Sequence, residues 1–254
     1  LDMADSGSEI WIAEGTYTPA TADDSLTFSG AIDGVDIYGG FDGSENTRPE
    51  RDPSTHTTIL SGDVGNDDEA IAPNTDNDGD FNTPTAIDHI VGENSNHVLY
   101  LDATSGGNIT NSTVIDGVTI TGGWANPSAS IPYPTGGGLV CDGRSGNQCS
   151  PTIRNVVFEG NAAVSGGGAI SNYGDAGTAS PQITNTTFYS NASTGPNSNG
   201  GTILNWGEGG EASPTLVNVE FRENYSGGDG GAINNYGLSG AADPVIANAI
   251  FANN

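Results

Sequence analysis

Residues 74–80 have the residue types and the spacing of a calcium-binding loop. Their sequence, NTDNDGD, places an oxygen-bearing side chain at every second position and a glycine at the sixth. The first half of an EF-hand loop follows the same pattern, and carboxylate oxygens favour calcium over transition metals. The candidate calcium ligands are Asn74, Asp76, Asp78 and Asp80.

This calcium loop is incomplete at its twelfth position. Thr85 stands where an EF-hand has a bidentate glutamate, and Asp63 or Asp88 could replace it. All of these residues belong to a long acidic insertion, 63–96. The alternative is that the insertion is a solvated loop without an ion. Calcium would relieve repulsion in a chain whose formal net charge is −27, although a saline habitat also favours such acidity.

The remaining charged residues argue against most other chemistry. The chain has no lysine and five arginines, Arg48, Arg51, Arg144, Arg154 and Arg222, which are too few to neutralise a nucleic-acid backbone. The three histidines have no metal-binding spacing and no companion nucleophile. The aspartate pairs 23–24 and 67–68 lie in loop-like sequence, so they do not indicate an acid/base pair. No apolar run reaches the ~18–20 residues of a membrane helix. We predict no catalytic activity, no nucleic-acid binding and no membrane span.

The two cysteines predict a local disulfide. Cys141 and Cys149 are separated by seven residues, whereas zinc ligands are more often two to four residues apart and need two further ligands. The alternative is a pair of unrelated free thiols. A disulfide is typical of proteins outside the cytosol, so we expect an extracellular or cell-surface location.

A repeat of about 30 residues must position these groups, and such periods are typical of stacked folds. Its equivalent phenylalanines are Phe158, Phe188, Phe221 and Phe251. Short alternating runs are bounded by Gly, Asn, Ser and Pro, without helical periodicity. We therefore predict an all-β chain, a right-handed parallel β-helix (solenoid) with one coil per repeat and long loop insertions. The single domain, 1–254, combines irregular coils in 1–111 with regular repeats in 112–254.

Three asparagine series recur in register with this repeat. They are Asn155, Asn185, Asn218 and Asn248; Asn161, Asn191, Asn224 and Asn254; and Asn172, Asn205 and Asn235. Because an amide both donates and accepts, equivalent asparagines can bond from coil to coil as structural ladders; ligand contacts are the alternative. Cys141 aligns with Asn172 of the third series. An aromatic stack is predicted beside this series, formed by Tyr173, Trp206 and Tyr236. The chain has five Asn-x-Ser/Thr sequons, some of which overlap these series. We do not predict glycosylation from them, because such sequons arise by chance in a chain so rich in Asn, Ser and Thr.

The repeat motifs resemble those of a known family. GGAI at 167–170 and 230–233 and GGTI at 200–203 alternate with FEGN, FYSN, FREN and FANN. This pattern resembles the GGAI/FxxN repeats of the polymorphic outer membrane proteins and of the wider secreted right-handed parallel β-helix repeat proteins of bacteria. The resemblance covers 112–254, and residues 37–63 look like the N-terminal coils of such proteins. It implies a secreted or surface location and a structural or adhesin-like role, often within a longer chain.

We therefore expect a non-catalytic extracellular scaffold or adhesin-like β-helix, of a kind that can assemble into a larger surface or filamentous structure. The alternative is a carbohydrate-active or carbohydrate-binding β-helix of pectate-lyase-like fold, for which Trp124 and Tyr133 are the aromatic candidates. Lyases of that kind use a Lys or Arg base near calcium, and the Arg-x-Lys segment of the related hydrolases is missing here. Expected partners are further coils of the same kind, or cell-surface glycans or proteins.

The fourth repeat is cut at Asn254, before a GGAI partner run. A β-helix that ended there would expose the edge of a coil, which favours strand pairing. We expect either that the natural polypeptide continues or that another subunit stacks on this end.

Overall fold

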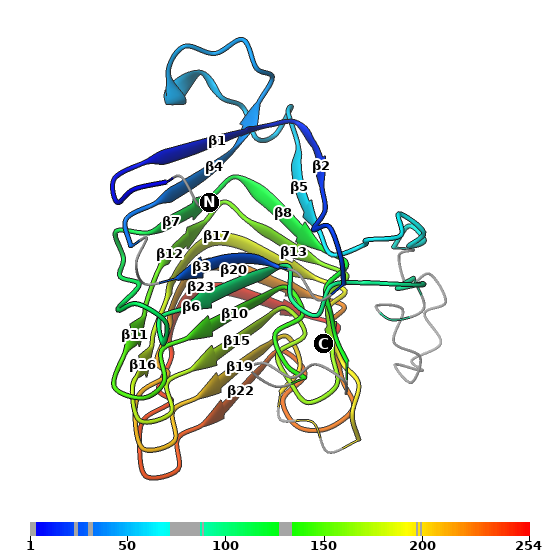
Figure 1. The fold of residues 1–254 in the computed structure, drawn as a ribbon. Helices are drawn as coiled ribbons and strands as arrows, with labels where there is room; N and C mark the ends of the chain where they lie inside the picture. Colours follow the sequence, from blue (N-terminus) through cyan, green and yellow to red (C-terminus); the bar gives the residue numbers. More distant parts are fainter. Residues whose placement is uncertain are drawn as a thin grey trace.

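The computed structural model describes residues 4–22, 25–29, 33–71, 87, 89–126, 134–196, 198 and 200–254. Nearly all of their regular structure is β-strand, and the strands form long parallel sheets (Figure 1). The prediction of an all-β chain with parallel pairing is confirmed at this level.

In the described part of the chain, the largest sheet has eleven strands. They are β1 (Glu9–Ala13), β2 (Gly15–Tyr17), β4 (Asp36–Phe41), β5 (Thr58–Ser61), β7 (Val114–Asp116), β8 (Val118–Thr121), β12 (Thr152–Arg154), β13 (Val157–Glu159), β17 (Gln182–Tyr189), β20 (Thr215–Arg222) and β23 (Val245–Ala252). A six-stranded sheet contains β3 (Leu26–Ser29), β6 (Leu99–Asp102), β10 (Leu139–Asp142), β15 (Ile170–Tyr173), β19 (Ile203–Trp206) and β22 (Ile233–Tyr236).

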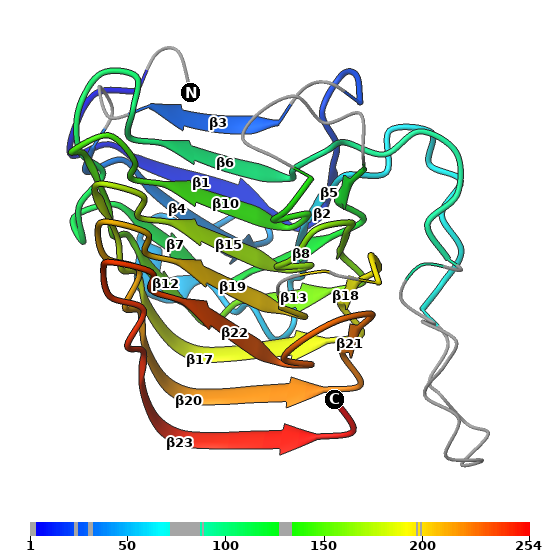
Figure 2. The same ribbon diagram turned by 90° about the horizontal axis from the view of Figure 1, so that it is seen from below.

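Two smaller sheets lie at the corners between these layers. The four-stranded one contains β9 (Trp124–Ala125), β14 (Ala162–Ala163), β18 (Ala192–Ser193) and β21 (Tyr225–Ser226), and the two-stranded one contains β11 (Gln148–Cys149) and β16 (Thr178–Ala179). A short 3-10 helix, η2 (Arg48–Glu50), follows β4. Equivalent strands of successive repeats therefore pair in parallel within each sheet, and Figure 2 shows them stacked from β1 and β3 at one end to β23 at the other.

The interior is built from columns of equivalent side chains. Phe158, Phe188, Phe221 and Phe251 are paired in register, with ring centroids 5.3, 4.6 and 4.9 Å apart and the rings within 8° of parallel. A parallel sheet spaces its strands by about 4.8 Å, so each ring stacks on the ring of the neighbouring strand.

A left-handed asparagine allows both halves of β17 to face this interior. Ile183 and Phe188 are both fully buried, although they are five residues apart and strict alternation would place them on opposite faces. Asn185, between them, has φ of 50°, and this turn reverses the alternation. Asn tolerates that backbone conformation better than other residues with a side chain. The equivalent residues Asn155, Asn218 and Asn248 have φ of 52°, 55° and 53°.

The insertion 63–96 leaves the stack between β5 and β6 (Figure 1). Ile87 and Ile90 of the insertion pack against a small cluster formed by Ala162 and Ala192, together with Trp124 and Tyr225. The described parts of the insertion are therefore docked on the corner that carries the four-stranded sheet.

Candidate functional site

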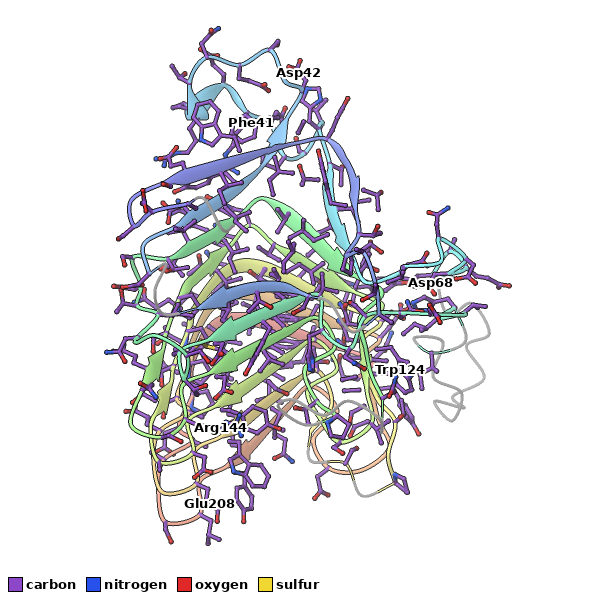
Figure 3. The ribbon with its side chains drawn as sticks, viewed as in Figure 1. Phe41, Asp42, Asp68, Trp124, Arg144 and Glu208 are labelled. Carbon is purple, nitrogen blue, oxygen red and sulfur yellow. A yellow bond between two sulfur atoms is a disulfide. The ribbon has the colours of Figure 1, made fainter. Side chains whose placement is uncertain are left out.

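The predicted calcium loop cannot be placed in this fold. Asn74, Asp76, Asp78 and Asp80 lie outside the described residues, as do Thr85 and Asp88. The structure does describe the base of the insertion, where three aspartates come together. Figure 3 shows Asp68 on this side of the molecule, away from Arg144 beside the six-stranded sheet.

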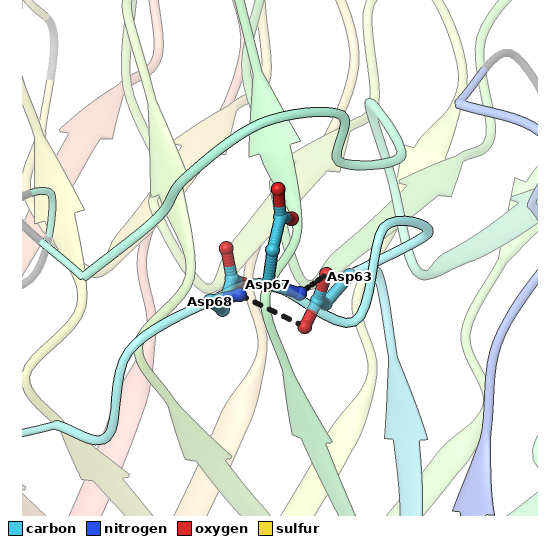
Figure 4. Close-up of side chains that lie close together, drawn as sticks. All are labelled: Asp63, Asp67 and Asp68. Atoms are coloured by element: carbon cyan, nitrogen blue, oxygen red, sulfur yellow. Dashed lines mark hydrogen bonds between the residues drawn. The ribbon is translucent and has the colours of Figure 1, made fainter.

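These aspartates are Asp63, Asp67 and Asp68. Each contributes one carboxylate oxygen to a group whose members all lie within 4.8 Å of one another (Figure 4). The Asp63 carboxylate accepts the backbone N–H groups of Asp67 and Asp68, both at 3.1 Å. Asp63 also forms an antiparallel bridge with Asn94, so the outgoing and returning segments of the insertion meet here.

Asp68 is the most enclosed carboxylate of the group. Its Oδ1 accepts the Val91 N–H at 2.7 Å, and its Oδ2 accepts the Asn94 Nδ2 at 2.8 Å. Burial raises the pKa of Asp68 above its usual range, Asp63 adds to the rise, and the two hydrogen bonds oppose it. Burial likewise raises the pKa of Glu159 on β13. Crowded carboxylates of this kind are hard oxygen donors that suit a divalent cation.

The first asparagine series forms a ladder on the outer surface. Asn185 Nδ2 donates to Asn155 Oδ1 at 3.3 Å, and the same bond joins Asn218 to Asn185 at 3.0 Å and Asn248 to Asn218 at 2.5 Å. All four residues are exposed. The donors point toward the N-terminal coils, and the series ends on Asp116 Oδ1, which accepts the Asn155 Nδ2 at 2.9 Å.

The second series forms a ladder that runs in the opposite direction and is buried at Asn161, Asn191 and Asn224. Asn161 Nδ2 donates to Asn191 Oδ1 at 3.0 Å, Asn191 to Asn224 at 3.1 Å, and Asn224 to Asn254 at 2.7 Å. The same amides satisfy backbone groups, because Asn191 Nδ2 also donates to Phe158 O at 2.9 Å and Asn191 Oδ1 accepts the Asn161 N–H at 3.1 Å. This series therefore hydrogen-bonds buried backbone groups along the stack.

The third series meets the disulfide at its N-terminal end. Asn172 Nδ2 donates to Asn205 Oδ1 at 2.8 Å, and Asn205 to Asn235 at 2.7 Å. Cys141 is paired in register with Asn172 and is bonded to Cys149. A half-cystine offers no donor, and Asn172 Oδ1 is buried without a hydrogen-bond partner. Beside this series the rings of Trp206 and Tyr236 are stacked with their centroids 4.1 Å apart, and the Arg144 guanidinium lies over the ring of Tyr173.

Because Asn172 Oδ1 has no partner, we predict that asparagine at position 141 stabilises the fold relative to alanine once the disulfide is removed. Replacing Cys141 and Cys149 by alanine is expected to cost about 2–3 kcal/mol through the lost cross-link. Cys141→Asn with Cys149→Ala should recover about 1 kcal/mol of that loss, because the new amide can donate to Asn172 Oδ1. Chemical denaturation of the two double variants measures the difference. Equal stabilities would contradict the assignment of Cys141 to the ladder position.

Three of the five arginines gather around Asp116. The Arg51 guanidinium and the Arg154 Nε both lie 2.8 Å from its carboxylate oxygens, and Arg48 lies over the ring of Tyr38 nearby. Burial raises the pKa of Asp116, but hydrogen bonds from Arg51, Asn155 and Arg154 outweigh it and hold that pKa below its usual range. This arrangement is a buried ion-pair network at the start of the outer ladder.

The other candidate groups are dispersed over the described residues. His56 pairs with Glu14 at 2.8 Å on the surface, and the buried His97 lies 3.0 Å from Gly136 O. Trp124 packs in the cluster beneath the insertion, while Tyr133 and the pair 23–24 lie outside the described residues. No helix among the described residues is long and apolar enough to cross a membrane.

The sequence predicts only one member of the acidic group, Asp63, as a ligand. It presents Asp67 and Asp68 as a pair in loop-like sequence and gives no signal for Asn94. The sole sequence signal was the acidic run DVGNDD at 63–68. Comparison of the chain with family models, with curated proteins and with solved structures finds no match.

Proposed function

We propose that the protein is a right-handed parallel β-helix that serves as a non-catalytic extracellular scaffold, adhesin-like in type, similar to the secreted GGAI/FxxN repeat proteins of bacteria. The observation that carries the proposal is the stacking of equivalent side chains one coil apart, above all the phenylalanine column Phe158, Phe188, Phe221 and Phe251. Each coil of a solenoid contacts mainly its neighbours, so the fold grows by repetition. Such a rod displays its loops at fixed spacing.

The ion pairs support a structural role. Every arginine of the chain is paired with a carboxylate: Arg48 with Glu9, Arg51 and Arg154 with Asp116, Arg144 with Asp142, and Arg222 with Glu220. An arginine that acted as the base of a lyase would have to give up such a partner. The disulfide supports a location in an oxidising compartment.

We further propose that coils of the same register pair with the outer edge of β23. Ile246 and Phe251 are 41% and 51% exposed, although the equivalent side chains of the preceding coils are fully buried. Among the described strands, β23 pairs only with β20. A coil with a matching phenylalanine and matching asparagines would cover both side chains, whether it belongs to this chain or to another.

The edge proposal predicts self-association of the 254-residue chain. Ile246→Lys combined with Phe251→Lys places charge in the interior columns and should abolish association. The matched control, Val245→Lys with Ile250→Lys, adds the same charge to the same strand at outward positions and should associate as the unmodified chain does. Sedimentation velocity over a range of protein concentrations measures this. A monomeric unmodified chain, or equal behaviour of the two variants, would refute edge pairing between copies of the chain.

The non-catalytic assignment is tested separately. Incubation with a panel of acidic and neutral polysaccharides should release neither reducing ends nor unsaturated products. Release of either by the chain would support the carbohydrate-active alternative and overturn the scaffold proposal.

A further inference from the structure

We propose that a hollow on the outer surface, beside the start of the exposed asparagine ladder, binds a neutral sugar residue of a glycan. The segment between β4 and β5 lies outside the stack of strands and forms one wall of this hollow (Figure 1). The lining side chains are Arg48, Arg51, Asp52, Ser54 and Asn155, together with two prolines. The inference rests on the proposed adhesin-like function, for which it names the class of ligand and the place that binds it.

The hollow is large enough for such a ligand. Its volume is about 480 Å³. Sites for small molecules generally have volumes of about 300–1,000 Å³ and carry a small number of placed polar groups that fix the orientation of the ligand.

The two arginines are held in place by residues that do not line the hollow. The Arg51 guanidinium lies 2.8 Å from the Asp116 carboxylate, and its side chain is only 14% exposed. Arg48 pairs with Glu9 and lies over the ring of Tyr38, 4.5 Å from the ring centroid. Side chains fixed in this way lose little conformational freedom when a ligand binds, which favours affinity.

These side chains keep hydrogen-bond donors for a ligand. Among the described residues, Arg48 bonds only through Nη1, so its Nε and Nη2 are uncommitted. Asn155 donates one amide N–H to Asp116 and accepts one from Asn185. Because an amide has two N–H groups and two oxygen lone pairs, Asn155 retains one donor and one acceptor position.

Asp52 supplies an acceptor on the same wall. Its carboxylate accepts the Ser54 N–H at 3.0 Å, the Ser54 hydroxyl at 2.5 Å and the Thr55 hydroxyl at 2.9 Å. The hydrogen bonds from Ser54 and Thr55 hold the pKa of Asp52 below its usual range, so the group is a carboxylate at neutral pH. A carboxylate has about four lone-pair positions, so one remains for a ligand.

Uncommitted donors beside uncommitted acceptors suit a polyhydroxyl ligand, because every hydroxyl group both donates and accepts. An anion would lie beside Asp52 and would be repelled by a chain of net charge −27. A cation would lie beside two guanidinium groups. Pro49 and Pro53 add apolar surface against which the C–H groups of a sugar ring can pack. The lining therefore favours a neutral sugar over either kind of ion.

Saturation-transfer NMR with the methyl glycosides of glucose, galactose, mannose and N-acetylglucosamine tests the site, and isothermal titration calorimetry measures the affinity of each glycoside that binds. Arg48→Gln and Asp52→Asn should each weaken binding roughly tenfold, because each removes a hydrogen bond from a charged group. The matched controls, Arg222→Gln and Asp175→Asn, remove the same charges at exposed positions elsewhere and should leave the affinity unchanged.

The proposal is overturned if none of these glycosides binds, or if Arg48→Gln and Asp52→Asn bind as the unmodified chain does. Binding of methyl glucuronide or inorganic sulfate in place of the neutral glycosides would also overturn it, because the hollow would then be an anion site. None of these outcomes affects the scaffold proposal, which rests on the phenylalanine column. Conversely, release of reducing ends from a glycan that binds in the hollow would refute the non-catalytic function and support the sugar site.

Discussion

Replacement of Asp116 by asparagine is expected to lower the free energy of unfolding by about 3–5 kcal/mol, the range for breaking a buried ion pair from one side. Asp116 is 2% exposed and faces two guanidinium groups, of which Arg51 is only 14% exposed. The substitution keeps the size of the side chain and removes the carboxylate that compensates the charge of the partly buried Arg51. Urea denaturation measures the loss. Glu220→Gln, at the partly exposed partner of the exposed Arg222, is the control and should cost under about 1 kcal/mol.

The same carboxyl predicts a pH dependence with a defined sign. Its pKa is lowered from the model-compound value of 3.8 by the arginine and asparagine hydrogen bonds, which outweigh burial. A carboxyl with a lowered folded-state pKa contributes stability above the unfolded-state pKa and loses it as the pH falls through the folded-state pKa. The stability difference between the unmodified chain and Asp116→Asn should be constant above about pH 5 and shrink below pH 4. A difference independent of pH down to pH 2 would contradict the ion-pair account.

The second large effect is expected at Asn191. Asn191→Ala removes the acceptor of the Asn161 N–H and the donor to Phe158 O, both inside the stack. At about 1–3 kcal/mol for each unsatisfied buried group, the loss should reach roughly 3 kcal/mol or more. Thermal unfolding followed by circular dichroism measures it.

The outer ladder supplies the matched comparison. Asn185→Gly introduces a residue that also tolerates φ of 50°, and it breaks only exposed hydrogen bonds. The substitution should therefore lower the free energy of unfolding by less than about 1 kcal/mol. Asn185→Ala should cost about 1–2 kcal/mol, mainly through backbone strain. Equal losses at Asn185 and Asn191 would refute the distinction between an exposed and a buried ladder.

The repeat predicted most of the regular half of the fold because its columns are spaced evenly in the sequence. Phe158, Phe188 and Phe221 recur at steps of 30 and 33 residues, and the parallel pairing follows that alignment. The strand pairing of the N-terminal half was harder to predict from the sequence. Ile37 and Ile115 occupy neighbouring positions in one column, yet 78 residues separate them because the insertion intervenes. Periodicity does not reveal a repeat interrupted in this way.

Other features of the structure cannot be predicted from the period of the sequence. The Asn155 and Asn161 series repeat with identical steps, so spacing alone could not show that the first is exposed and the second buried. Asp63 and Asn94 meet because the ends of the insertion return to the same corner, an antiparallel contact between segments that share no pattern. The acidic group therefore depends on tertiary structure, and its residues could not be grouped in advance.

The opposed directions of the ladders have an electrical consequence. Aligned amides add their dipoles, and in an α-helix this sum leaves partial charges at the two ends. Here the amides of the Asn161 and Asn172 series donate toward the C-terminal end, whereas those of the Asn155 series donate toward the N-terminal end. The backbone dipoles of a β-sheet alternate and largely cancel. Two amides per repeat therefore oppose one, and each repeat adds the net dipole of about one amide instead of three. A long stack then develops a smaller end potential than three aligned ladders would create.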